Sequence, residues 1–217
     1  MGRVSTGGEF RRLRRFGLSV CSPRVVAVAL PLLLTGSALA LASAGVLAQR
    51  TRFQIDPAQS TVHFALGDTL HHFAGTFQIA SADIAFDPTL HQLHGRIAVD
   101  SATGRSGSKA RDKRMTNEEL RAGDFPTVTF EPQSYTGDLS LSGPSQIQVS
   151  GIFTLLGQRH PITVPMSIQM NGSHCTASGQ FDVPYIAWGL KDPSMLFVKM
   201  QKQVRIDLTL NGQILQQ

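Results

Sequence analysis

The sequence predicts an all-β protein built on an antiparallel sheet that closes into a barrel or folds into a sandwich. Three observations lead to this class. From residue 53 onward, apolar and polar residues alternate with a period of two, as expected for strands with one buried face. Short turn motifs separate the alternating runs. Only residues 112–122 have a helical pattern, with Met115 and Leu120 on the same side.

The alternating runs follow one another along almost the whole chain after residue 53. Each run predicts one strand, and the runs begin at Val62, Phe73, Ile84, Leu93, Val128, Ile147, Ile162, Cys175 and Val204. The dipeptide Asn171–Gly172 joins two of the longest runs and is a strong hairpin signal. Eight or nine such strands, mostly connected by short turns, favour an antiparallel barrel or sandwich.

The inward face of this sheet combines bulky and small residues. A barrel of about eight strands has an interior that holds its own side chains or one small ligand. Phenylalanines dominate the predicted inward face, but the same face includes small residues at Gly75, Gly95, Gly151, Ala177 and Gly179. Small residues in such positions either make room for bulky neighbours or line a cavity, and the pattern leaves both explanations open.

The first 48 residues have the form of a secretory signal peptide. They contain six arginines and one acid, followed by an uncharged apolar run over residues 25–48. Val46 and Ala48 are small residues at the positions that a signal peptidase reads, so we expect cleavage after Ala48. The alternative is an uncleaved membrane anchor, because the run is long enough to span a bilayer.

Cleavage would leave one domain, residues 49–217, in the periplasm or outside the cell. This segment contains 14 Lys and Arg and 14 Asp and Glu, so its net charge is zero. A neutral domain has no overall field to attract a polyanion, which argues against nucleic acid as a partner. Cys175 is its single cysteine, so an intrachain disulfide and a thiolate metal cluster are both excluded.

Motifs for catalysis or metal binding are absent from the sequence. The seven histidines form no His-Glu-x-x-His pattern, and no nucleophile elbow or phosphate-binding loop occurs. We therefore predict no enzymatic activity, no catalytic residues, no metal site and no cofactor other than a bound lipid.

The order of several short motifs resembles the YceI-like family. The segments that carry the resemblance are Phe53–Pro57 with Ser60, Gly75–Phe77, Ile84–Pro88, Thr103–Gly104, Arg111–Asp112, Phe125–Phe130, Tyr185, Trp188–Leu190 and a final strand at 204–208. Together they extend over residues 52–213. Each motif alone is weak, whereas their order is fairly specific.

The resemblance implies an eight-stranded lipocalin-like barrel with one short helix in a segment that crosses the mouth. It also implies an exported binding protein for a long-chain apolar ligand, such as a polyisoprenoid, a quinone-like molecule or a fatty-acyl lipid. The predicted apolar lining of the ligand site consists of Phe64, Phe73, Phe77, Phe153, Met166, Ile168, Phe181 and Trp188. The predicted contacts with the ligand head group, at the mouth, are Lys109, Arg111 and Asp112.

Other interpretations remain open at this point. The basic stretch over residues 105–115 has a simpler explanation as a solvated loop, in which Arg111 and Asp112 make a local structural contact. The barrel as a whole would also suit a structural or stress-response protein with a packed core, or an accessory of a membrane quinone or cytochrome system. A lipid carrier is expected to contact a membrane transiently, and a homodimer is compatible with the sequence.

Overall fold

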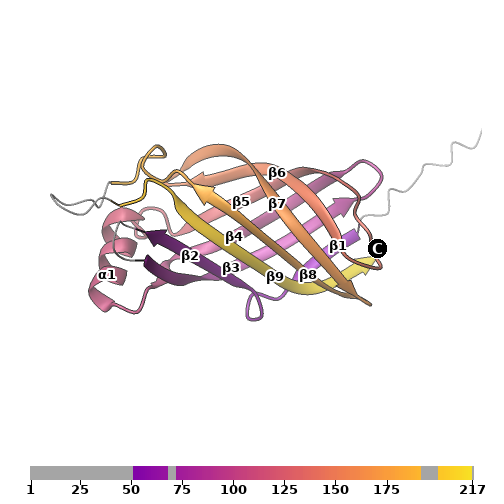
Figure 1. Cartoon of the computed structure of the whole chain (residues 1–217), viewed down its shortest axis with the longest axis horizontal. Coiled ribbons are helices and arrows are strands. Elements are labelled where there is room, and N and C mark those ends of the chain that lie inside the picture. Colours follow the sequence, from indigo (N-terminus) through magenta and orange to yellow (C-terminus); the bar gives the residue numbers. More distant parts are fainter. Residues whose placement is uncertain (1–50, 68–71, 192–199, 217) are drawn as a thin grey trace, which may run out of the picture. The chain divides into compact units, whose positions relative to one another are not determined.

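Nine antiparallel strands form one sheet that closes into a barrel (Figure 1). The computed structural model describes residues 51–67, 72–191 and 200–216, and the predicted signal peptide lies outside these ranges. Within them, no helix has the length and apolar character needed to cross a membrane. The strands are β1 (Thr51–Ile55), β2 (Thr61–Gly67), β3 (His72–Asp87), β4 (Gln92–Arg105), β5 (Thr127–Thr136), β6 (Ser145–Leu155), β7 (Gln158–Asn171), β8 (His174–Val183) and β9 (Val204–Gln216).

The nine strands occupy eight positions around the barrel, because β1 and β2 share one of them. Both strands pair with β3 on one side and with β9 on the other. Phe53 of β1 pairs with Ile84 and Ile214, whereas Phe64 of β2 pairs with Gly75 and Ile206. The predicted eight-stranded barrel is therefore confirmed, with one of its eight positions made from two short strands.

The long strand β3 joins two of the runs that the sequence separates. The apolar residues are odd-numbered in the run over 73–79 and even-numbered in the run over 84–86. In a single regular strand, odd-numbered and even-numbered side chains point to opposite faces of the sheet. The register against β4 shifts between Ile79 and Ser81. This bulge inserts one residue, and it lets Ile79 and Ile84 both lie in the core.

The predicted hairpin at Asn171–Gly172 is present between β7 and β8. Asn171 pairs with His174, and Gly172 has a φ of 61°, in the region that glycine adopts without strain. Pairing between β7 and β8 continues from this turn to Met166 and Gly179 and then stops.

Beyond that point β7 and β8 are not paired with each other. The first half of β7 continues beside β6, and the second half of β8 continues beside β9. Pro161 and Pro165 lie in this unpaired part of β7. Because proline has no backbone N–H, it is tolerated where a strand lacks a neighbour on one side.

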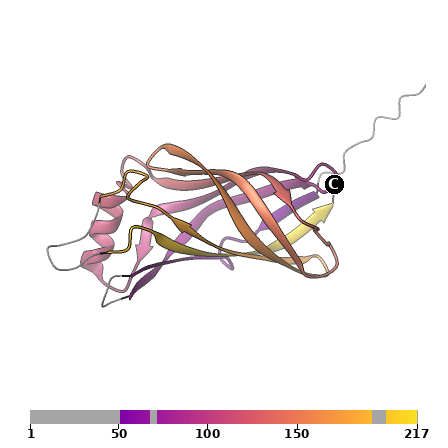
Figure 2. The same ribbon diagram turned by 45° about the horizontal axis from the view of Figure 1, so that its top comes forward.

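A short helical segment covers one end of the barrel, which we call the helix end (Figures 1 and 2). It consists of α1 (Lys109–Arg114) and a π-helical turn, η1 (Met115–Glu119). The helical segment of the structure therefore covers residues 109–119, and the predicted range of 112–122 was three residues too late at both ends. Arg121, with a φ of 49°, follows its last turn. The opposite end, where β1 begins and β9 finishes, is the far end.

Candidate functional site

A cavity of about 460 Å³ occupies the interior of the barrel. Its lining extends from Met115 and Leu190 at the helix end to Leu139 and Ile214 near the far end. Pockets that bind small molecules in proteins have volumes of roughly 300–1,000 Å³. The barrel is therefore hollow enough to hold a ligand of ordinary size.

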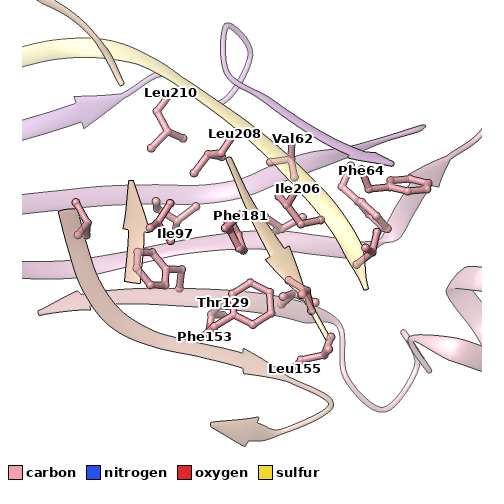
Figure 3. Close-up of a pocket in the computed structure, with 18 of the residues that line it drawn as sticks. Val62, Phe64, Ile97, Thr129, Phe153, Leu155, Phe181, Ile206, Leu208 and Leu210 are labelled. Carbon is pink, nitrogen blue, oxygen red and sulfur yellow. The ribbon is translucent and has the colours of Figure 1, made fainter. Parts of the chain in front are cut away.

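The wall of the cavity is almost entirely aliphatic and aromatic, because every second residue of each strand points inward. Figure 3 shows this arrangement for residues from six strands. The labelled residues that line the cavity are Val62, Phe64, Ile97, Thr129, Phe153, Leu155, Phe181, Ile206, Leu208 and Leu210. An interior of this kind favours an apolar ligand, since burial of apolar surface is the main favourable contribution to the free energy of binding.

Seven of the eight predicted lining residues do line this cavity. They are Phe64, Phe73, Phe77, Phe153, Met166, Ile168 and Phe181. Several of them contact one another: the rings of Phe64 and Phe77 lie 5.3 Å apart, and those of Phe153 and Phe181 lie 6.0 Å apart. Whether a ligand touches them remains a prediction.

Trp188 is the exception, since it packs behind the wall and not in it. Its ring stacks on His160 of β7, with centroids 4.1 Å apart and an angle of 6° between the planes. Its ring also lies 5.7 Å from that of Phe153, which does line the cavity. The segment that follows β8 thus brings Trp188 onto the unpaired half of β7, a placement that strand alternation could not reveal.

The three residues predicted at the mouth have different environments. Arg111 borders the cavity, with its guanidinium group 4.7 Å from the ring centroid of Phe73. Lys109 is exposed and Asp112 is buried, and neither belongs to the lining.

Asp112 and Arg111 are tied together through Ser106. Asp112 Oδ1 accepts hydrogen bonds from Ser106 Oγ at 2.5 Å and from the Ser106 backbone N–H at 2.7 Å. Arg111 Nε donates to Ser106 Oγ at 2.7 Å, and its Nη2 donates to the Ser106 carbonyl at 2.8 Å. The basic stretch therefore forms a local structural contact, as the simpler explanation proposed, and it also places Arg111 at the mouth.

These contacts hold the pKa of Asp112 below its ordinary value of 3.8. The hydrogen bond from Ser106 Oγ makes the largest contribution, and burial opposes it. The Ser106 backbone N–H and the charges of Arg105 and Arg111 lower the pKa further. Asp112 thus accepts the two hydrogen bonds from Ser106 as a carboxylate, and these bonds hold the loop that leads into α1.

Other polar groups at the helix end, beyond the three predicted at the mouth, were not predicted from the sequence. Besides Arg111, the lining there includes Ser101 of β4, Arg114 of α1, Glu119 of η1 and Lys191. Ser101 shares its parity with Ile97 and Val99, a signal that could have identified it as inward-facing. Glu119 could not have been found this way, because its direction depends on the π-helical turn.

Cys175 also lines the cavity, closer to the far end. Its thiol is free and buried, and burial raises its pKa to about 11. It is therefore a neutral apolar group at ordinary pH. Within the described ranges, no three His, Cys, Asp or Glu side chains come together in a way that could hold a metal ion.

Comparison with known proteins identifies relatives of this barrel. The model of the YceI-like domain matches residues 53–212. BcnA of Burkholderia cenocepacia has a similar crystal structure, with a TM-score of 0.62 and 22% sequence identity, over 73% of this chain and 99% of BcnA. A polyisoprenoid binding domain from Saccharophagus degradans, implicated in plant cell wall breakdown, has a TM-score of 0.58 and 14% identity, over 76% of this chain and 98% of that domain. No curated protein sequence matches the chain.

Proposed function

The chain belongs to the YceI-like domain family, and on that basis we propose that it is a non-enzymatic carrier that holds a long-chain apolar lipid inside its barrel. Polyisoprenoid, quinone-like and fatty-acyl chains all belong to this ligand class. The Saccharophagus degradans relative, described as a polyisoprenoid binding domain, supports the first of these.

The observation that carries the proposal is the apolar cavity along the barrel. A barrel with a purely structural role gains stability from a filled core, and interiors of proteins are normally close-packed. The residues around an empty interior space of about 460 Å³ lose van der Waals contacts, which lowers the stability of the barrel unless a ligand fills the space. Each methylene group that moves from water into such a space contributes about 0.8 kcal/mol, or about a fourfold change in affinity.

Filling the cavity with a side chain should remove ligand binding. Ala177 of β8 lines the cavity between Ile168 of β7 and Leu210 of β9, its partners in the sheet. We expect Ala177→Phe to place a ring in the ligand's path and to leave the purified protein without stoichiometric lipid. The measurement is mass analysis of lipid extracted from the protein, with Ala177→Leu as a milder variant.

The matched control is Gln169→Phe, which adds the same ring to the outer face of β7. Gln169 is exposed and pairs with Thr176, the residue next to Ala177. We expect this variant to retain wild-type lipid. If folded Ala177→Phe and Ala177→Leu proteins both carried full lipid, the ligand site inside the barrel would be wrong. If the wild-type protein accepted no lipid, the carrier function itself would be wrong. A quinone-like species in the extract would instead indicate a role beside a membrane electron-transfer system.

We also propose that the carrier works in the periplasm or outside the cell. This rests on the signal-peptide pattern of the first 48 residues. Exchange of ligand would then require transient contact with a membrane, because long-chain lipids have low solubility in water.

A further inference from the structure

The lysines in the part of the chain that the structure describes gather at the helix end of the barrel. They are Lys109 and Lys113 of α1, Lys191 in the segment after β8, and Lys202 just before β9. Lys191 borders the helix end of the cavity, and the residue before Lys202 donates its backbone N–H to the Gly67 carbonyl, where β2 ends. No lysine or arginine occurs over residues 160–190. The exported domain is neutral as a whole, but its positive charge is unevenly distributed.

These lysines differ from the arginines on the wall of the barrel, which have acidic partners. Arg52 lies 2.7 Å from Asp83, and Glu131 lies between Arg96 at 2.8 Å and Arg159 at 3.2 Å. Within the described ranges, none of the four lysines has an acid at ion-pair distance. The wall is therefore largely neutralised by pairing, whereas the lysines keep their charge available to a partner.

Two of the lysines lie side by side on the outer face of α1. Lys109 and Lys113 are four residues apart, which places them on the same face of a helix, and both are exposed. Asp112 and Thr116 are buried and lie on the opposite side, toward the barrel. The outer face of α1 thus presents two ammonium groups to the surroundings and keeps its one acid inside.

The acids of the helix end do not cancel this charge. Glu118 and Glu119 share Arg114, at 3.9 and 3.6 Å, and Asp124 pairs with Arg121 at 2.6 Å. These five groups carry one net negative charge together. Against it stand the four lysines and a further exposed cation, Arg105, while Arg111 balances the buried Asp112.

Two acids lie farther along the strands. Asp100 of β4 and Asp207 of β9 are half-buried, and they accept hydrogen bonds from the Ala102 backbone N–H and the Gln180 side chain. Their two charges reduce the positive balance without reversing it. The described part of the helix end is therefore a basic surface.

This basic surface surrounds the mouth of the cavity. Arg111 and Lys191 border the cavity and are also exposed, so the cavity comes close to the surface between them. Half-buried apolar residues, Phe73, Leu190 and Met200, line the cavity at the same end. Cations outside an apolar wall match the order of groups in an anionic membrane, where charged head groups cover the acyl chains.

We propose that the helix end docks on the surface of an anionic phospholipid membrane through Lys109, Lys113, Lys191 and Lys202. This inference rests on the proposed carrier function and identifies the surface that meets the membrane. Docking in this orientation places the mouth against the bilayer, so that an apolar ligand crosses with less of its surface in water. A bilayer suits the position of the charge at the mouth, because the bilayer is where such a ligand resides.

The experiment measures binding of the full exported domain to vesicles by flotation. One set of vesicles is phosphatidylcholine alone, and the other contains about one third phosphatidylglycerol. We expect binding to the anionic vesicles only, with an affinity that falls as salt is added, because salt screens exposed charges.

Variants assign the binding to the basic surface. The double variant Lys109→Gln with Lys113→Gln should bind anionic vesicles at least tenfold more weakly, since each lysine near such a surface contributes about fivefold, or about 1 kcal/mol. The matched control, Arg52→Gln with Arg96→Gln, removes the same charge from the wall and should change binding by less than about twofold. Glu118→Gln removes an exposed negative charge from the helix end and should strengthen binding.

A second measurement follows transfer of a fluorescent lipid from the loaded protein to vesicles. Wild-type protein should deliver the lipid faster to anionic than to neutral vesicles. The double lysine variant should lose this difference, while the wall variant should keep it.

The outcomes separate docking from the carrier function. If wild-type protein carried lipid but bound both kinds of vesicle equally, or neither, membrane docking would be wrong and the carrier function would stand; an acidic protein would then be the partner to seek. Equal losses in the lysine and wall variants would also overturn the docking surface, because they would indicate an effect of net charge alone. Lysine-dependent binding by a protein that accepts no lipid would overturn the carrier function and leave the docking surface in place.

Discussion

At the scale of single residues, the inward glycines mostly give space to bulky neighbours. A Cβ atom on Gly75 would lie 2.5 Å from the ring of Phe64, and one on Gly179 would lie 2.3 Å from Met166 Sδ. Phe64 and Met166 both line the cavity. Of the two explanations that the sequence left open, packing applies to these glycines, while Ala177 borders the cavity itself.

Gly75→Ala should therefore destabilise the barrel. Its Cβ would also lie 2.2 Å from the Arg105 carbonyl oxygen, a backbone atom of the neighbouring strand that cannot move aside cheaply. Overpacking of this kind costs about 1–3 kcal/mol. The measurement is the free energy of unfolding in urea.

Gly123→Ala is the control, since a Cβ there has no neighbour within 4 Å. We expect its unfolding free energy to stay within about 0.5 kcal/mol of the wild-type value, as for most surface substitutions. Equal stability of the two variants would show that β3 and β4 separate more easily than the register implies.

At the scale of elements, the link between β4 and α1 depends on one ionised side chain. The carboxylate of Asp112 accepts two hydrogen bonds from Ser106. The backbone N–H of Asp112 donates to the Ser108 carbonyl at 2.8 Å, at the start of the helix. Because the folded protein lowers the pKa of Asp112, the unfolded chain binds more protons between the two pKa values. Its contribution to stability is therefore present above about pH 4 and is lost as the pH falls through the folded pKa.

Asp112→Asn should flatten this part of the pH dependence. Between about pH 5 and pH 3, the variant should lose less unfolding free energy than the wild-type protein, and it should be less stable at neutral pH. Unfolding in urea at several pH values measures both effects. The control is Asp138→Asn, at an exposed position in the connection after β5, which should keep the pH dependence of the wild-type protein. If the stability of Asp112→Asn changed with pH in the same way as that of the wild-type protein, the role assigned to Asp112 would be contradicted.

The limits of sequence reasoning are clearest at the element scale. The inward position of Phe153 followed from its parity within a strand, which is a local property of the backbone. The location of Trp188 depends on where β7 and β8 stop pairing, and the direction of Glu119 depends on a π-helical turn. The first depends on pairing between two strands and the second on an irregular turn with hydrogen bonds such as Leu120 N–H to the Met115 carbonyl, so no regular period in the sequence reports either of them.

At the scale of the whole molecule, the proposed export depends on the first 48 residues. The predicted signal peptide carries the excess of basic residues, and the domain after it is neutral. If the full chain is produced in a bacterial host, we expect the protein recovered from the periplasm to begin at Gln49. N-terminal sequencing checks this expectation.

Substitution at the cleavage site provides the matching control. Ala48→Arg should block processing, because the peptidase needs a small residue there, whereas Ala44→Arg should not. Recovery of the intact chain from the membrane fraction in every case would favour the uncleaved anchor.

The sequence by itself determined that the chain forms one-sided antiparallel strands, since alternation of apolar and polar residues fixes which face of each strand is buried. It also determined most of the apolar lining for the same reason. Only the tertiary structure decided that β1 and β2 share one position and that the closed barrel keeps an open interior. These features depend on how far the bulky side chains fill the enclosed volume, and that is a property of all the strands together.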